Sequence, residues 1–218
     1  MKLIRFITGE PALVFYDALV VADTHFGIEE KYVKGKFYAL SWEIAARLRS
    51  LGKRYRKKKI FILGDVKDSI LSTPEIVREV LLFLSKDFEV WVAKGNHDGG
   101  LQKLRIKNVK IFSKGFEYMG AAFFHGHATP PKKLLRKNLL FMSHGHLEWN
   151  GEKVWLISEE GKRKLIVVPS FNPAVGRDVD SPVGPLFRNK IFKWLPSKLY
   201  TLNGALIGNV ESLVKNRG

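Results

Sequence analysis

Five short polar clusters in this sequence carry side chains that bind metal ions. They contain carboxylate, imidazole and amide groups, and they include all 6 histidines of the chain. In chain order the clusters are Asp23-Thr24-His25, Gly64-Asp65, Gly95-Asn96-His97-Asp98, His125-Gly126-His127 and Ser143-His144-Gly145-His146. Such oxygen and nitrogen ligands hold divalent transition metals, and two ions roughly 3.5–4 Å apart can bind the oxygens of one phosphoryl group. The clusters therefore predict a two-metal site suited to phosphoryl chemistry.

Each cluster directly follows, or lies close behind, a short apolar run. The runs occupy positions 18–21, 60–63, 90–93, 121–124 and 139–142. Runs of this length and composition are typical of buried strands. Open α/β sheets bind ligands beyond the carboxyl ends of their strands, so the clusters are expected to meet at one sheet edge. Histidines scattered through a core would not be distributed in this way.

The remaining pattern predicts two packed sheets flanked by helices. Helices are expected over 38–51, over 74–85 with Thr73 as N-cap, and briefly after Pro130-Pro131. A hairpin is expected from 153–158 and 164–168. Strands are further expected near 2–7, 12–15, 18–22, 60–63, 88–93, 109–112, 121–124 and 139–142.

The order of the five clusters resembles that of the calcineurin-like metallophosphoesterases, with 95–98 as the most specific element. The resemblance covers roughly residues 18–150. Two features, His125-Gly126-His127 and the segment 168–173, are similar to a prokaryotic branch whose genes often neighbour a large DNA helicase. The resemblance implies an α/β fold, a four-layer α/β/β/α sandwich of two mixed sheets with a dinuclear metal site at one edge. It also implies a single domain over 1–218. The metal motifs lie within 18–150, and residues 151–218 complete the sandwich.

The resemblance also implies roles for the matching residues. Asp23 and His25 are expected to hold the first metal, and Asp65 is expected to bridge both ions. The ligands expected for the second metal are Asn96, His125 and His146. His97 is expected to protonate the leaving oxygen or to stabilise charge on the phosphoryl group, with Asp98 orienting its ring. An imidazole beside a carboxylate suits an acid of this kind.

The last cluster departs from the family pattern, which is Gly-His-x-His. With Gly145-His146 aligned to its first two residues, Glu148 stands where the second histidine is expected. Glu148 is therefore expected to complete the first metal site, with His144 as the alternative. An oxygen ligand favours harder ions, so two manganese ions are expected, with magnesium, iron, nickel and zinc as alternatives. His127 either contacts substrate or supports His125.

Composition limits the class of protein. The chain of 218 residues is long enough for a sizeable core. It has no apolar stretch of the length of a transmembrane helix, and Arg5 interrupts the first apolar run, so a signal peptide is not expected. Zero cysteines exclude disulfides and thiolate metal sites. A cytoplasmic location is expected, and the single glutamine together with abundant lysine suggests a thermophilic source.

The charge of the chain predicts a polyanionic partner. The net charge is +16, and positions 47–59 hold eight basic residues and no acidic one. Basic segments with aromatic neighbours suit nucleic acid, because phosphates bind the cations and bases stack on the rings. A lysine-rich solvated surface is the alternative, although acidic residues number 21 against 37 basic ones. The candidate nucleic-acid-binding residues are Lys57, Lys58, Lys132, Lys133 and Arg136.

These features together predict metal-dependent hydrolysis of phosphodiesters in nucleic acid or nucleotides, with DNA or RNA as substrate and a helicase as a partner. Two alternatives stand beside this prediction. One is a phosphomonoesterase or cyclic-nucleotide phosphodiesterase, and the other is a non-catalytic binding module with the same fold. Metal content separates the binding module from the two enzymes.

Overall fold

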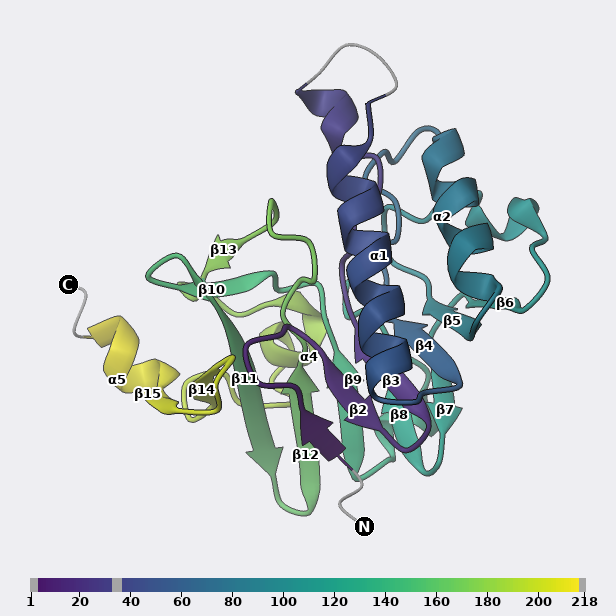
Figure 1. The fold of residues 1–218 in the computed structure, drawn as a ribbon. Coiled ribbons are helices and arrows are strands. Elements are labelled where there is room, and N and C mark those ends of the chain that lie inside the picture. Colours follow the sequence, from purple (N-terminus) through teal and green to yellow (C-terminus); the bar gives the residue numbers. More distant parts are fainter. Residues whose placement is uncertain (1–3, 33–36, 216–218) are drawn as a thin grey trace.

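Two mixed β-sheets pack face to face, and helical segments lie over their outer faces, which makes four α/β/β/α layers (Figure 1). The computed structural model describes residues 4–32 and 37–215. The expected fold class is confirmed, while the assignment of 1–218 to one domain stays a prediction. None of the helices among the described residues has the length and apolar character needed to cross a membrane.

The first sheet has the strand order β1-β2-β3-β4-β5-β6. Strands β3 to β6 run parallel, and β1 and β2 join them in antiparallel pairs. The polar clusters that follow β3, β4 and β5 therefore emerge at the same edge of this sheet. The bounds of the strands are β1 Ile4–Phe6, β2 Leu13–Phe15, β3 Ala18–Val21, β4 Lys59–Ile62, β5 Glu89–Ala93 and β6 Val109–Phe112.

The second sheet has the order β13-β10-β11-β12-β9-β8-β7, and β14 adds to β11 and carries β15. Strands β8, β9 and β12 run parallel, so the clusters after β8 and β9 also leave at one edge. The bounds are β7 Phe116–Tyr118, β8 Ala121–Phe123, β9 Leu139–Met142, β10 Leu147–Trp149, β11 Glu152–Glu160, β12 Arg163–Val167, β13 Arg177–Asp178, β14 Lys198–Thr201 and β15 Leu206–Asn209.

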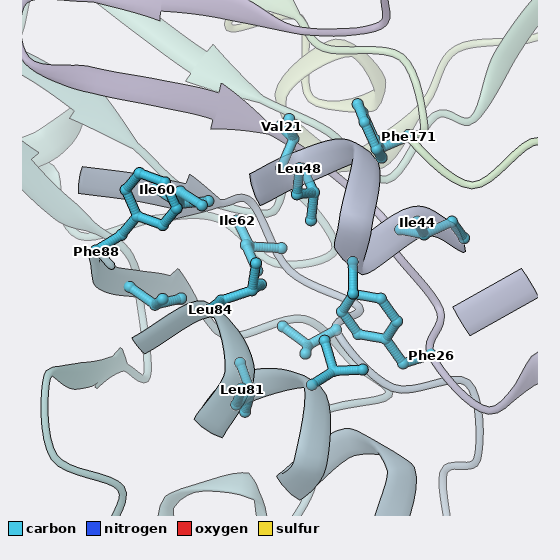
Figure 2. Close-up of a cluster of buried hydrophobic side chains, with 14 of the residues drawn as sticks. Val21, Phe26, Ile44, Leu48, Ile60, Ile62, Leu81, Leu84, Phe88 and Phe171 are labelled. Atoms are coloured by element: carbon cyan, nitrogen blue, oxygen red, sulfur yellow. The ribbon is translucent and has the colours of Figure 1, made fainter. Parts of the chain in front are cut away.

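Strand periodicity explains why both faces of the first sheet are buried. Successive side chains of a strand point to opposite faces. In β4, Ile60 and Ile62 pack against helices α1 (Ala39–Arg54) and α2 (Glu75–Ser85) (Figure 2). Phe61, between them, packs into the core between the two sheets. Two apolar cores thus fix the sheet from which Asp23 and Asp65 emerge.

Smaller helical segments cover the outer face of the second sheet. They include α4 (Gly184–Arg188), whose Leu186 and Phe187 pack against side chains of β9 and β12. On the same face lie α3 (Lys132–Leu135) and α5 (Val210–Lys215), which pack through Leu134 and Val210. The remaining short helices lie on the side of the first sheet: η1 (Ile28–Lys31) contacts α1, and η2 (Leu101–Leu104) packs through Leu101 against the core beneath α1 and α2.

The expected elements are mostly present, with shifted ends. The first helix continues to Arg54, three residues beyond its expected end at 51. Thr73 is not the N-cap of α2, because the helix begins at Glu75 and its N-cap is Pro74, which has an extended backbone and no capping side-chain bond. The strand expected near 2–7 is found as β1, with residues 2 and 3 outside the described part.

Candidate metal centre

Ligand-bearing side chains from both sheets meet in adjoining groups beyond the carboxyl ends of the parallel strands. Within each group the candidate ligand atoms lie within 4.8 Å of one another. The first group is Asp23, His25, Asp65 and His146, and the second is Asp65, His125 and His144. Asp65 belongs to both groups, which is the arrangement that a bridging carboxylate requires. A further group, His25, Asp68 and His97, shares His25 with the first.

The first group contains nitrogen atoms without hydrogen-bond partners. Nε2 of His25 and Nε2 of His146 are buried and accept or donate no hydrogen bond among the described residues. Nε2 of His146 lies 3.6 Å from Oδ1 of Asp23, and Nε2 of His25 lies 3.9 Å from Oδ2 of Asp65. Buried polar atoms are nearly always satisfied. Two buried carboxylates and two unsatisfied imidazole nitrogens fit a divalent cation.

In the second group, lone pairs of several side chains face Nε2 of His125. Its Nδ1–H donates to the carbonyl of Leu63 at 3.0 Å, so Nε2 is free to act as a ligand. That Nε2 lies 3.2 Å from Oδ1 of Asn96, 3.3 Å from Oδ2 of Asp65 and 3.1 Å from Nδ1 of His144. Several acceptor atoms facing one another need a positive charge between them, so this donor set also fits a cation.

The pKa shifts of the site residues also indicate that positive charge is favourable between the carboxylates. Burial opposes protonation of His125, but the carboxylates of Asp65 and Asp23 raise its pKa to about 9. Burial and the neighbouring His125 lower the pKa of His144 to about 4. Burial raises the pKa of Asp65, but the His125 contact outweighs it and holds that pKa well below the ordinary value.

Unusual backbone conformations aim these side chains. Five non-glycine residues of the two groups have left-handed φ values: Asp23 (49°), His25 (44°), Asp65 (45°), His144 (69°) and His146 (48°). This region is disfavoured for residues with a Cβ, and each such residue costs roughly 1–3 kcal/mol. Strain concentrated on candidate ligands indicates that the fold is selected for the site geometry.

A segment remote in sequence fixes the loop after β3. The side-chain amide of Asn172 donates to the carbonyl of Thr24 at 2.9 Å, and the backbone N–H of Phe171 donates to Ala22 at 2.8 Å. Ser143 also contacts this loop, because its Oγ lies 3.3 Å from Oδ1 of Asp23. The sequence did not assign Asn172 or Ser143 to the site. The segment 168–173 was a signal for the first, but its role required the fold.

The histidines of the last polar cluster join other ligand groups than the sequence predicted. His144 joins the second group and His146 joins the first, so Ser143-His144-Gly145-His146 takes the place of Gly-His-x-His with serine at the first position. The His-x-His spacing was a sequence signal for this register. His146 thus lies with the residues expected for the first metal, whereas the sequence placed it with those of the second.

Glu148 lies outside both groups among the described residues. Its Oε1 is 3.6 Å from Nζ of Lys153, and it packs so closely on Gly176 that a Cβ at Gly176 would be 1.9 Å from Oε1. The left-handed backbone at His146 breaks the strand alternation just before β10. Glu148 therefore does not point where a residue two positions after His146 would point in a regular strand.

His97 lies beside the first group with its ring held by backbone. Its Nδ1–H donates to the carbonyl of Asp68, and its own backbone N–H donates to Oδ1 of Asp65 at 3.0 Å. The ring centroid is 5.1 Å from that of His25. Nε2 takes part in none of the hydrogen bonds among the described residues.

Asp98 has no hydrogen bond to the His97 ring among the described contacts, although the sequence predicted that it orients this ring. Its Oδ1 accepts the backbone N–H groups of Val66 and Lys67, at 2.9 and 3.3 Å, and its Oδ2 accepts that of Gly95 at 2.8 Å. The side chain is fully buried, and this burial raises its pKa. Asp98 joins the loops after β4 and β5, so it positions the backbone that carries Asp65.

The candidate nucleic-acid-binding residues lie in two places. Lys57 and Lys58 precede β4, so they are at the amino end of the strand whose carboxyl end leads to Asp65. Lys57 there donates to the carbonyl of Tyr16 at 3.0 Å. The structure therefore does not bring Lys57 and Lys58 to the metal-ligand groups. The other three candidate residues, Lys132, Lys133 and Arg136, lie in and directly after α3. They are exposed and follow the loop after His127.

Comparison with known proteins identifies the family. Residues 17–204 match the family model "Calcineurin-like phosphoesterase", so the chain belongs to the calcineurin-like phosphoesterases. No match was found among the curated proteins.

Two solved structures share the fold. A Pseudomonas putida nuclease, MPE, has a TM-score of 0.58 and 21% identity over 88% of this chain and 89% of its own. YfcE, a phosphoesterase from E. coli, has a TM-score of 0.52 and 15% identity over 88% of this chain and 96% of its own. At these identities the likeness concerns the fold.

Proposed function

We propose that this chain hydrolyses phosphodiester bonds in nucleic acid or nucleotides with two divalent metal ions. The observation that carries the proposal is the pair of ligand groups that share Asp65. Two adjoining cation sites with a common carboxylate suit phosphoryl chemistry, and the described side chains offer candidate ligands for both. The unsatisfied Nε2 atoms of His25 and His146 support the same conclusion, since a bound cation would use both lone pairs.

The proposed ligands follow the geometry. The first ion takes Asp23, His25, Asp65 and His146, and the second takes Asp65, Asn96, His125 and His144. Bound ions of this kind supply Lewis-acid activation of water and neutralise charge on the phosphoryl oxygens. Each proposed set holds two imidazole nitrogens and two oxygens, which suits iron, nickel and zinc as well as manganese. Manganese stays the proposed ion, but without Glu148 the preference for harder ions no longer rests on an added oxygen ligand.

His97 is the proposed proton donor to the leaving oxygen. The carbonyl of Asp68 fixes its Nδ1–H, so the ring keeps one orientation and Nε2 faces outward from that contact. His97 is only partly buried, which allows a substrate to reach it. A positioned imidazole typically contributes about 10²–10⁴-fold to the rate.

A nucleic-acid substrate is supported by charge. The net charge of +16 attracts polyanions, and phosphate contacts dominate the affinity of such complexes. One of the proteins with the same fold is described as a nuclease. A helicase partner, a cytoplasmic location and a thermophilic source stay predictions of the sequence.

A metal-content and substrate screen tests the proposal. The protein is loaded with manganese and assayed with bis(4-nitrophenyl) phosphate, 4-nitrophenyl phosphate and oligonucleotides. We expect two ions per chain and faster hydrolysis of diesters than of the monoester. Asp65→Ala should lose metal and activity together, and Asn96→Ala should lose the second ion. The matched control is Asp87→Ala, an exposed aspartate paired with Arg49 and Lys53 at the end of α2.

Three results would contradict the proposal. Wild-type protein with less than one ion per chain would indicate a binding module. Two ions retained in Asp65→Ala would remove the bridging assignment. A preference for the monoester would replace the diesterase with a phosphomonoesterase on the same metal site.

A further inference from the structure

A cavity of about 360 Å³ adjoins the second ligand group. Its lining includes His125 and His127 from the segment after β8, and Lys94 and Lys114 from the segments after β5 and β6. This volume is within the range of ligand pockets, about 300–1,000 Å³. The cavity therefore adjoins the candidate metal centre on the side of His125 and His127.

We infer that this cavity binds a second phosphate, the one next to the scissile phosphodiester along a nucleic-acid strand. The inference rests on the proposed function, because it names the substrate class of the same site. The site assigned here is Lys94 and Lys114, with Thr129 and His127 as further polar groups on the wall.

The backbone brings the two lysines to the same wall. The N–H of Lys94 donates to the carbonyl of Phe112 at 2.9 Å, so the ends of β5 and β6 lie side by side. Lys114 follows two residues later. The chain then turns tightly at Gly115, whose φ is 88° and where a Cβ would be 2.4 Å from the carbonyl oxygen of Phe123. The paired ends of β5 and β6 and the turn at Gly115 thus fix the backbone positions of both lysines.

The charge in this cavity is uncompensated. None of the described residues that line it is acidic. Lys94 and Lys114 have no ion pair within the described part of the chain, whereas Lys133 and Lys137 nearby both pair with Glu117. Two unpaired ammonium groups in a concave site beside a phosphoryl-binding centre favour a bound anion.

The candidate substrates differ in the number of phosphates that they carry, and this number distinguishes them. A phosphomonoester or a cyclic nucleotide has one phosphate, which the metal centre itself holds, so two further cations have no partner in it. A strand has a phosphate on each nucleotide, and the wall residues Phe124, Ala128 and Pro131 offer apolar contact for a sugar or base. The exposed cations of α3 begin directly after Pro131, so a strand that leaves the cavity passes more positive charge. A nucleoside diphosphate shares the two-phosphate chemistry and is distinguished by experiment.

The test measures binding and catalysis in the same variants. Lys94→Gln, Lys114→Gln and the double variant are compared with Lys107→Gln, an exposed lysine before the amino end of β6 and hence at the opposite edge. A labelled single-stranded oligonucleotide is titrated by fluorescence anisotropy into calcium-loaded protein at several salt concentrations. Each removed contact should weaken binding roughly tenfold and reduce the slope of log K against log salt by about 0.7.

Catalysis is measured in the manganese-loaded protein. The ratio of kcat/KM on a trinucleotide to kcat/KM on the single-phosphate ester bis(4-nitrophenyl) phosphate should fall about tenfold in each cavity variant and stay constant in Lys107→Gln. An equal fall on both substrates, or a salt slope like that of the control, would overturn the inference. Stronger competition by a nucleoside diphosphate than by an equal concentration of trinucleotide would overturn the assignment to a strand. Absence of all phosphodiester hydrolysis would defeat the proposed function, while the salt slopes would still decide the subsite.

Discussion

Nε2 of His125 lies 3.1 Å from Nδ1 of His144, and this contact joins the loops that follow the parallel strands β8 and β9. At this distance two imidazoles cannot both be protonated, and burial with the neighbouring His125 lowers the pKa of His144 to about 4. A divalent ion between them would use both lone pairs at once. The relationship makes His144 a ligand candidate, whereas Glu148 lies outside both groups and contacts Lys153.

The first prediction compares these two residues. His144→Ala should reduce the manganese content from two ions to one per chain, because the second group loses a nitrogen ligand. Glu148→Gln should keep both ions and lose only its contact with Lys153, 3.6 Å away. Metal analysis after gel filtration measures the content. The opposite pattern, with the ion lost from Glu148→Gln alone, would restore Glu148 as a ligand.

The second prediction concerns the glycine before Asn96. A Cβ at Gly95 would be 2.1 Å from Oδ1 of Asp65 and 2.5 Å from its backbone nitrogen. Gly95→Ala must therefore displace the shared carboxylate, and we expect loss of metal and at least a hundredfold loss of activity, in line with loss of a catalytic group. Gly99→Ala is the matched control, since its Cβ would be 3.7 Å from the nearest atom, the carbonyl oxygen of Ile70. Wild-type metal content in Gly95→Ala would mean that the loop relaxes without moving Asp65.

The sequence predicted the strands and the edge at which the clusters meet, because strand periodicity and apolar runs are local properties. Ile60, Phe61 and Ile62 alternate between two cores as that pattern requires. The sequence did not predict β14, β15 or α4, whose short segments gain their stability from packing on the second sheet. Such elements depend on contacts that the local pattern does not contain.

The sequence predicted which residue types gather at the site better than it predicted the contacts that each of them makes. The roles of His144 and Glu148 depended on the left-handed turn at His146, and the two-residue shift of the motif from 145–148 to 143–146 cannot be read from composition. The role of Asp98 depended on which donors surround it. Three backbone N–H groups occupy its carboxylate, and backbone donors carry no sequence signal.

The third prediction tests His97 as an acid. His97→Ala should keep both metals, because the ring is outside the proposed ligand sets, and should slow turnover by roughly 10²–10⁴-fold. Substrates with a nitrophenyl leaving group should lose least, since that oxygen leaves without protonation. Rates on nitrophenyl and alkyl diesters, measured side by side, provide the check. Equal losses on both would assign His97 to charge stabilisation instead.

Asp98→Asn serves as the comparison for that experiment. The amide offers only one oxygen for the three N–H donors, so stability should fall by roughly 1–3 kcal/mol. The preference for good leaving groups should not change, because Asp98 does not contact the His97 ring among the described contacts. A changed leaving-group preference in Asp98→Asn would return Asp98 to the role of orienting the acid.

The fourth prediction concerns stability and pH at a site remote from the metals. Asp17, in the turn between β2 and β3, accepts hydrogen bonds from Lys59 at 2.8 Å and from the hydroxyl of Tyr118 in the second sheet. Burial would raise the pKa of this carboxyl, but the bonds from Lys59 and Tyr118 hold it below the ordinary value of 3.8. Asp17→Asn should therefore lower the free energy of unfolding at pH 7 by about 1–2 kcal/mol.

The pH dependence of that difference has a definite direction. A carboxyl whose pKa is lower in the folded state stabilises the protein above its unfolded pKa, and this contribution is lost as the pH falls through the folded value. The gap between wild type and Asp17→Asn should thus be constant from about pH 7 to pH 5 and shrink only below the ordinary value of 3.8. Urea unfolding at a series of pH values measures it. Tyr118→Phe, which removes one donor and keeps the carboxylate, should show a smaller gap with the same pH profile. A gap that widens as the pH falls below 3.8 would show that the folded protein favours the protonated carboxyl instead.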